Sequence, residues 1–187
     1  MRIVFIGPPG AGKGTQAARL SQRFRMPHLS TGELLREACR LQTEVGKQAA
    51  AYMEAGQLAP DHLVHEIVVE RIGHADCTNG YLMDGFPRTV PQARRFDQFL
   101  QEQGAPLDVV IELRVRESDL LARLRGRKRH DDVEQVVHNR LEQYRQLTTP
   151  ILDYYRDAGL LKTIDGHGSP DEVTERLIEA IESAGSA

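Results

Sequence analysis

The stretch Gly7-Pro8-Pro9-Gly10-Ala11-Gly12-Lys13-Gly14-Thr15 decides the fold of this chain. It follows the apolar run Arg2 to Ile6, which is typical of a strand buried on both faces, and it leads into the amphipathic stretch Gln16 to Arg23. The spacing Gly-x4-Gly-Lys between a strand and a helix predicts a loop whose backbone N–H groups surround a phosphate. A glycine-rich turn without a ligand is the alternative, and the position of Lys13 disfavours it.

This phosphate loop, residues 7–15, departs from the usual pattern at one place. Ser or Thr commonly follows the lysine and ligates magnesium, whereas here Gly14 follows it and Thr15 comes one residue later. We therefore expect magnesium to be held mostly through water and nucleotide oxygens. The loop alone indicates nucleotide binding and no particular reaction, because ATPases, GTPases and many kinases share it.

Further strand patterns alternate with helical ones. The segments Gly80 to Asp84, Val109 to Val115 and Leu160 to Asp165 are apolar or β-branched, and Met26 to Leu29 is a weaker candidate because it contains Pro27. Such alternation predicts an open α/β fold with a parallel sheet.

The helical patterns predict one insertion and one break. Between about Gly32 and Gly56, two short amphipathic helices, Glu33 to Leu41 and Glu44 to Ala55, indicate a helical insertion on the sheet. The long helical pattern from Asp132 to Asp157 contains Pro150, so a break is expected near Thr149. The last helix follows a capping box with proline at its first helical position, Ser169-Pro170-Asp171-Glu172.

Composition limits the class of protein. The 187 residues, 40% of them hydrophobic, suit a single domain, and the net charge of −3 provides no global attraction for nucleic acid or a membrane surface. We find no apolar run long enough to span a bilayer and no room for a signal peptide, so a cytoplasmic protein is expected. Cys39 and Cys77 are too few for a four-thiolate zinc site and are expected to be reduced thiols. Each histidine is expected at the surface, without metal-ligand spacing: His28, His62, His65, His74, His130, His138 and His167.

A second motif, Asp84-Gly85-Phe86-Pro87-Arg88, ends one of the predicted strands. A carboxylate at the carboxyl end of a parallel strand points into the crevice where such folds bind ligands, so Asp84 can orient hydrated magnesium. Arg88 follows a stiff turn and can contact a phosphate with both arms of its guanidinium. A turn with a solvated arginine is the alternative for this segment taken alone.

A third motif is the densest positive charge of the chain, which gathers between Arg123 and Arg129. Taken alone, this run is compatible with a solvated helix end, a localisation signal or a nucleic-acid patch. In the company of a phosphate loop it favours an arginine clamp, because phosphoryl transfer needs alignment and positive charge around the moving group.

Together these motifs resemble those of adenylate kinases, and they occur in the same order. The resemblance spans the chain from Arg2 to the last helix and rests on GPPGAGKGTQ (Gly7 to Gln16), STGELLR (Ser30 to Arg36), DGFPR with Gln92, and RLRGRKRHDD (Arg123 to Asp132). It implies a P-loop three-layer fold formed by residues 1–187, with a central five-stranded parallel sheet. It also implies a helical insertion, residues 30–59, that closes over a nucleoside monophosphate, and a short lid, residues 126–132, without zinc.

The resemblance also implies a role for individual residues. On the ATP side these are Gly10, Ala11, Gly12, Lys13, Gly14, Thr15, Arg123, Arg127 and Gly168. On the AMP side they are Thr31, Arg36, Gln57, Leu58, Ala59, Gly85, Phe86, Pro87, Arg88, Gln92, Arg129 and Arg140. The residues expected to act in catalysis are Lys13, Arg88, Arg127, Arg129 and Arg140, with Asp84 holding magnesium through water.

The activity implied is reversible phosphoryl transfer from MgATP to AMP, giving two ADP, in a monomer that binds neither nucleic acid nor a membrane. We expect direct in-line transfer, because no residue is placed as a covalent carrier. Three alternatives stay open from the sequence: a UMP/CMP kinase, an ATP-binding switch that phosphorylates no monophosphate, and a protein that binds nucleic acid through the basic run Arg123 to Arg129.

Overall fold

A parallel sheet of five strands forms the centre of the computed structural model, which describes residues 1–126 and 134–185. The strand order β2-β3-β1-β4-β5 puts the strand before the phosphate loop in the middle, and every neighbouring pair is parallel. The predicted α/β fold with a five-stranded parallel sheet is confirmed. The strands are β1 (Arg2–Ile6), β2 (His28–Ser30), β3 (Tyr81–Asp84), β4 (Val109–Arg114) and β5 (Leu161–Asp165).

The weakest strand prediction is shifted, because the strand lies slightly later in the chain than expected. We expected Met26 to Leu29, whereas β2 begins at His28 and ends at Ser30. Pro27 has no N–H for the sheet, and its carbonyl oxygen accepts a hydrogen bond from Leu82 N at 2.9 Å, so it leads into the strand instead of belonging to it.

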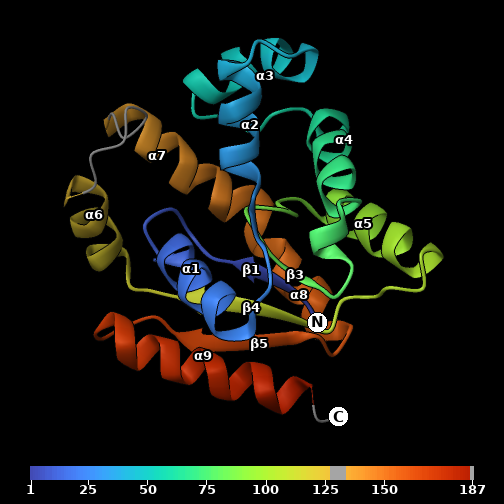
Figure 1. The fold of residues 1–187 in the computed structure, drawn as a ribbon. Coiled ribbons are helices and arrows are strands. Elements are labelled where there is room, and N and C mark those ends of the chain that lie inside the picture. The colour runs from blue at the N-terminus through green and yellow to red at the C-terminus, as the bar shows by residue number, and fades with distance from the viewer. Residues whose placement is uncertain (127–133, 186–187) are drawn as a thin grey trace.

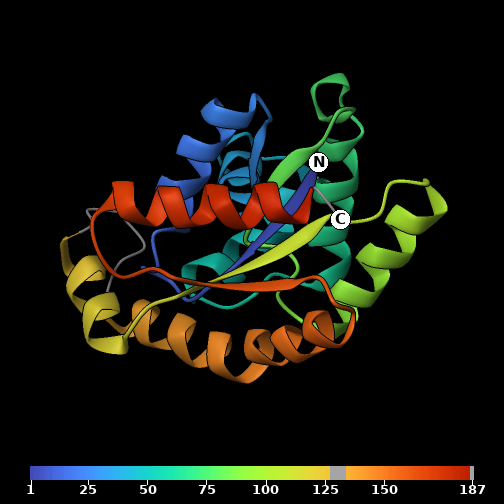
Figure 2. The same ribbon diagram turned by 90° about the horizontal axis from the view of Figure 1, so that it is seen from below.

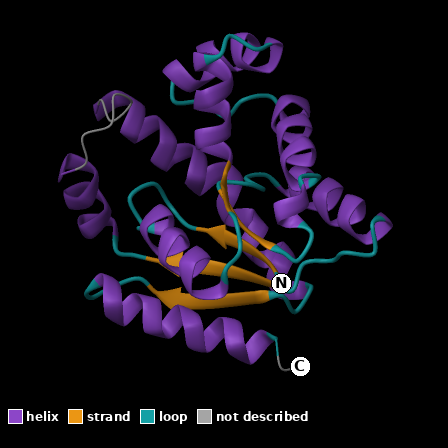
Figure 3. Ribbon diagram, viewed as in Figure 1, coloured by secondary structure: helices purple, strands orange, loops and turns teal. Residues whose placement is uncertain are grey.

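Helices cover both faces of the sheet, which gives three layers (Figures 1 to 3). Residues of β1 alternate between the two cores, as the period of a strand requires. Val4 and Ile6 pack in one core with residues of α4, α5 and α8, and Ile3 and Phe5 pack in the other with residues of α1 and α9. The helices are α1 (Lys13–Phe24), α2 (Thr31–Arg40), α3 (Glu44–Glu54), α4 (Asp61–Ile72), α5 (Val90–Glu102), α6 (Glu117–Gly126), α7 (Glu134–Gln143), α8 (Thr149–Asp157) and α9 (Pro170–Ala184), with a 3₁₀ turn at Ala75–Cys77.

Both helices predicted for the insertion are present as α2 and α3, and they stand above the sheet in Figure 1. They approach closely at Gly46, where an ideal Cβ would lie 2.1 Å from the carbonyl oxygen of Ala38. Only glycine permits that approach, so the two helices form one packed pair.

The break expected near Thr149 is present as a π-helical turn, Tyr144–Thr148, between α7 and α8. Pro150 lies in the first turn of α8, where its missing N–H is tolerated. The expected lid lies outside the described residues, apart from Gly126 at the end of α6. In the part of the chain that the structure describes, no helix has both the length and the apolar content needed to cross a membrane.

The predicted capping box at the start of α9 is confirmed. The Ser169 hydroxyl accepts from Glu172 N at 3.3 Å, and Glu172 Oε2 accepts from Ser169 N at 2.7 Å. We expect Ser169→Ala to lower the free energy of unfolding by about 1 kcal/mol, and so the melting temperature by about 2–4 °C. Calorimetry against Ser183→Ala, a change near the other end of the same helix, tests this. Equal melting temperatures for the two variants would contradict it.

A half-buried carboxylate joins α5 to α8 on the other face of the sheet. Asp97 accepts hydrogen bonds from Tyr154 Oη at 2.9 Å and from Tyr155 Oη at 3.2 Å, and the Tyr155 ring is fully buried. Burial raises the pKa of Asp97 above its ordinary value of 3.8, although both tyrosine hydroxyls act in the opposite direction.

This raised pKa makes stability depend on pH. The folded protein retains the Asp97 proton to a higher pH than the unfolded chain does, so this residue's contribution to stability falls as pH rises through the interval above 3.8. We therefore expect the free energy of unfolding to fall less steeply with pH in Asp97→Asn than in the unaltered protein. Urea unfolding between about pH 4 and pH 7 measures the slopes. Asp153→Asn, a change at an exposed carboxylate of α8, is the control, and identical slopes for Asp97→Asn and the control would refute the interpretation.

Candidate functional site

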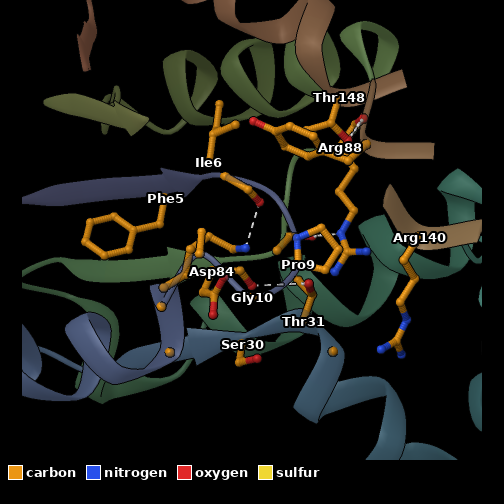
Figure 4. Close-up of a pocket in the computed structure, with 18 of the residues that line it drawn as sticks. Phe5, Ile6, Pro9, Gly10, Ser30, Thr31, Asp84, Arg88, Arg140 and Thr148 are labelled. Carbon is orange, nitrogen blue, oxygen red and sulfur yellow. Dashed lines mark hydrogen bonds between the residues drawn. The ribbon is translucent and has the colours of Figure 1, made fainter. Parts of the chain in front are cut away.

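A cavity of about 960 Å³ opens at the carboxyl ends of the strands, where parallel α/β sheets bind their ligands. The ends of β1, β2 and β3 contribute Ile6, Ser30 and Asp84 to its wall (Figure 4). The phosphate loop, the start of α2, the turn after β3 and the end of α7 also line it.

The phosphate loop has the backbone conformation that its glycines predict. Gly10 and Gly12 have φ values of 83° and 97°, in the left-handed region, and Gly12 is the N-cap of α1. Ala11 N donates to Pro8 O at 3.1 Å, which closes the turn. The loop therefore leads directly into a helix N-terminus, whose partial positive charge favours an anion.

Lys13 reaches back across this loop. Its Nζ donates to the carbonyl oxygens of Gly7 at 2.7 Å and Pro8 at 3.1 Å. The lysine stem is flexible, so the ammonium group can exchange these carbonyls for phosphate oxygens without any change in the fold.

Asp84, at the end of β3, provides negative charge beside the phosphate loop. Its side chain is 13% exposed, its Oδ2 lies 3.7 Å from His28 Nε2, and the same oxygen lies 4.0 Å from an ideal Cβ placed on Gly14. Burial alone would raise the pKa of Asp84, but His28, Lys13 and Arg88 together outweigh burial and hold it below the ordinary value. The carboxylate is therefore ionised at neutral pH.

Arg88 is fixed by the turn that carries it. Its Nε donates to Gly85 O at 2.7 Å, its backbone N donates to Gln92 Oε1 at 2.7 Å, and its carbonyl oxygen accepts from Thr148 Oγ1 at 3.0 Å. Gly85 has a φ of 87°, and an ideal Cβ there would lie 2.7 Å from Thr31 Oγ1, so no larger residue fits.

Positive charges converge on the same side of the cavity. Burial lowers the pKa of Arg88, Asp84 acts against that effect, and the charges of Arg140 and Arg36 lower it further. In Figure 4 the side chains of Arg88 and Arg140 extend into the cavity from different elements, the turn after β3 and helix α7. Like charges gathered in this way favour an anion, such as a phosphate, between them.

The segment 56–59 forms another wall of the cavity, next to Gln92. Leu58 N donates to Gln143 Oε1 at 3.0 Å, and Asn139 Nδ2 donates to Ala55 O at 3.2 Å, so α7 holds the end of the insertion. Apolar side chains of Met53 and Val64 also line this part. A wall of apolar groups with a few backbone and amide groups suits a planar base.

Arg123 joins the phosphate loop to the loop that follows the edge strand β5. Its two terminal nitrogens donate to Ala11 O at 3.2 Å and to Gly166 O at 3.1 Å. Gly166 and Gly168, from the loop between β5 and α9, line the cavity beside it.

The structure thus brings most of the predicted site residues to one cavity. Phe86 is the exception among the described ones, because its ring is buried in the core and meets Phe96 edge-on at 5.1 Å. Arg127 and Arg129 lie outside the described residues. The predicted residues that line the cavity are Gly10, Ala11, Gly12, Lys13, Gly14, Thr15, Thr31, Arg36, Gln57, Leu58, Ala59, Asp84, Gly85, Pro87, Arg88, Gln92, Arg123, Arg140 and Gly168.

The surface position expected for His28 is wrong. Its side chain is 17% exposed and lines the cavity beside Asp84, and its Nε2 has no hydrogen-bond partner among the described residues. The alternation along β2 puts His28 and Ser30 on one face, but this pattern does not reveal that the face borders the cavity. His65 is likewise half-buried, with its ring edge-on to Phe99 at 6.1 Å.

Comparison with known proteins agrees with this geometry. A family model described as adenylate kinase matches residues 5–160. The adenylate kinase of Mycobacterium sp. (strain MCS) is 49% identical over 181 residues, which cover 97% of this chain and 99% of that protein. That of Rhizobium meliloti (strain 1021) is 48% identical over 187 residues, covering 95% and 97% respectively. The chain therefore belongs to the adenylate kinase family and is a nucleoside monophosphate kinase.

Proposed function

We propose that this protein transfers a phosphoryl group reversibly from MgATP to AMP, giving two ADP. The observation that carries the proposal is that one cavity is lined both by the phosphate loop and by Arg36, Arg88 and Arg140. Two groups of anion-binding residues on one cavity suit a donor and an acceptor that each carry phosphate. The relatives named adenylate kinase support the same substrates.

On the ATP side, we assign the phosphates to the loop Gly10 to Thr15 and to Lys13. The backbone N–H groups and the start of α1 bind the β-phosphate region. The Lys13 ammonium group stays beside the negative charge of the phosphoryl group while that group is transferred. Arg123 and Gly168 line the part of the cavity assigned to the rest of the nucleotide, and Arg127 is assigned there by resemblance alone.

On the AMP side, we assign the phosphate to Arg36, Arg88 and Arg140, joined by Arg129 from the undescribed segment. The Arg88 side chain is already held by the hydrogen bond from its Nε to Gly85 O, so less side-chain entropy is lost when it binds a phosphate. The base is assigned to Gln92, Thr31 and the segment Gln57 to Ala59.

The residues present fit magnesium held through water. Asp84 is an ionised carboxylate close to Gly14, and the hydroxyl-bearing Thr15 also lines the cavity, so oxygen donors meet where the phosphates are assigned. Within residues 1–126 and 134–185, no group of three or more His, Cys, Asp and Glu forms a direct metal cage. Magnesium bound with ATP would neutralise charge that builds on the phosphate oxygens. Asp84 would orient its water ligands.

Water must be excluded while the phosphoryl group moves, since a kinase that assembles its site without the acceptor hydrolyses ATP. We propose that the insertion, residues 30–59, and the short lid, residues 126–132, close over the substrates. The contacts of Asn139 and Gln143 with the end of the insertion link its movement to α7, which carries Arg140.

The assignment predicts a large loss of turnover when either anion-binding group is removed. We expect Lys13→Ala and Arg88→Ala each to lower kcat/KM by at least about 10²-fold, because both residues meet charge that develops during transfer. Coupled assays of ADP formation measure this, with circular dichroism as the check on folding. Arg94→Ala, which removes an exposed arginine of α5, is the matched control. Near-normal ADP formation by either site variant would contradict the assignment.

The choice of acceptor is tested by initial rates with AMP, UMP and CMP at fixed MgATP. We expect AMP to be preferred by at least about tenfold in kcat/KM, since a purine fills more of the base pocket than a pyrimidine does. Preference for UMP or CMP would identify a pyrimidine kinase. A rate of ATP consumption that none of the three monophosphates changes would identify an ATP-binding switch.

A further inference from the structure

A carboxylate outside the cavity holds one of the residues assigned to the base. Asp61, the first residue of α4, accepts a hydrogen bond at its Oδ1 from Gln92 Nε2 at 2.6 Å. Asp61 is exposed and does not line the cavity, whereas Gln92 is 4% exposed and does. The contact joins α4 to the start of α5 and is made by a residue that the sequence analysis did not single out.

The other end of the same amide is held by the backbone. Gln92 Oε1 accepts from Arg88 N at 2.7 Å. An ionised carboxylate can only accept hydrogen bonds, and a backbone N–H can only donate one. The two partners therefore dictate which way the Gln92 amide faces: its NH₂ must meet Asp61 and its oxygen must meet Arg88 N.

This arrangement leaves a defined pair of groups for a ligand. An amide has two N–H groups and two lone pairs on its oxygen, and one of each is used within the described residues. The remaining N–H donor and lone-pair acceptor belong to a side chain on the cavity wall. The positions of this donor and this acceptor on the amide are fixed, because a rotated amide would lose both hydrogen bonds.

A rotated amide would meet the wrong partners at both ends. Its NH₂ would face the Arg88 N–H, donor against donor, and its oxygen would face the Asp61 carboxylate, acceptor against acceptor. Each contact would set like hydrogen-bonding groups against each other at a side chain that is itself buried, which is unfavourable at both ends.

Bases differ in the pattern that they present to such an amide. Adenine offers an acceptor at N1 and a donor at its 6-amino group, which match the free N–H and the free lone pair. A 6-oxopurine offers the reverse, a donor at N1 and an acceptor at O6, and it would need the rotated amide. We infer that Asp61, by fixing the orientation of the Gln92 amide, selects 6-amino over 6-oxo purine monophosphates; this rests on the proposed function.

The variant that tests this is Asp61→Asn. Asparagine has nearly the same size and can accept from the Gln92 NH₂ or donate to its oxygen, so both orientations of Gln92 find a partner there. Glu66→Gln removes an exposed carboxylate from the same helix and is the matched control. IMP is the informative competitor because its base differs from that of AMP only in the 6-substituent and the N1 proton.

We expect the AMP-to-IMP ratio of kcat/KM to fall about tenfold in Asp61→Asn and to stay unchanged in Glu66→Gln. The change should come from a higher KM for AMP and a lower KM for IMP, with kcat for AMP within about twofold, because Gln92 reads the base and not the moving phosphoryl group. A ratio within twofold of the unaltered protein, or an equal loss with both substrates, would overturn the inference.

A spectroscopic measurement separates this inference from the proposed function. The side-chain NH₂ proton signal of Gln92, assigned by its absence in Gln92→Met, should be shifted downfield in the unaltered protein and should move in Asp61→Asn but not in Glu66→Gln. An unchanged signal in Asp61→Asn would refute the fixed orientation even if AMP is the substrate. A shifted signal in a protein that forms no ADP from AMP would preserve the orientation but refute both the proposed function and the selection of the base.

Discussion

The ionised carboxylate of Asp84 is the charge on which the rest of the site depends. It ends a central strand and lies close to Lys13, His28 and Arg88, so the positive groups gather around a fixed negative one. That charge opposes the effect of Arg140 and Arg36 on the half-buried guanidinium of Arg88. The sheet thus does more than support the cavity. Strand β3 ends in Asp84, and the negative charge of this residue acts both on Lys13 of the phosphate loop and on Arg88.

Neighbouring residues and one distant segment meet at the turn that carries Arg88. Gly85 precedes it, Gln92 follows it, and Thr148 reaches it from the π-helical turn before α8. Helix α7 also contacts the end of the insertion through Asn139 and Gln143. The arginines of the cavity are therefore positioned by several elements that direct hydrogen bonds join.

Local sequence patterns were sufficient for most of the fold and for the phosphate loop. The run before Gly7 and the capping box at Ser169 act through neighbouring residues, so they can be recognised without knowing the tertiary structure. His28 was misplaced because its surroundings depend on strand parity and on Asp84, which is 56 positions away in the chain. Phe86 was included in a motif whose other members line the cavity, but its apolar ring is more stable in the core. Asp61 gave no signal, since an acid in the first turn of a helix is common for reasons of the helix dipole alone.

The hydrogen bonds of Lys13 and Leu58 have a consequence for how fast the enzyme can turn over. Lys13 Nζ already donates to two carbonyl oxygens, and Leu58 N already donates to Gln143. A nucleotide that binds these groups replaces internal partners instead of meeting unsatisfied ones, so the net gain in free energy per contact is smaller than the contact suggests. The same internal partners are ready to take the groups back when the products leave. In the proposed reaction, such exchange would favour rapid product release, and release often limits turnover in enzymes that close over their substrates.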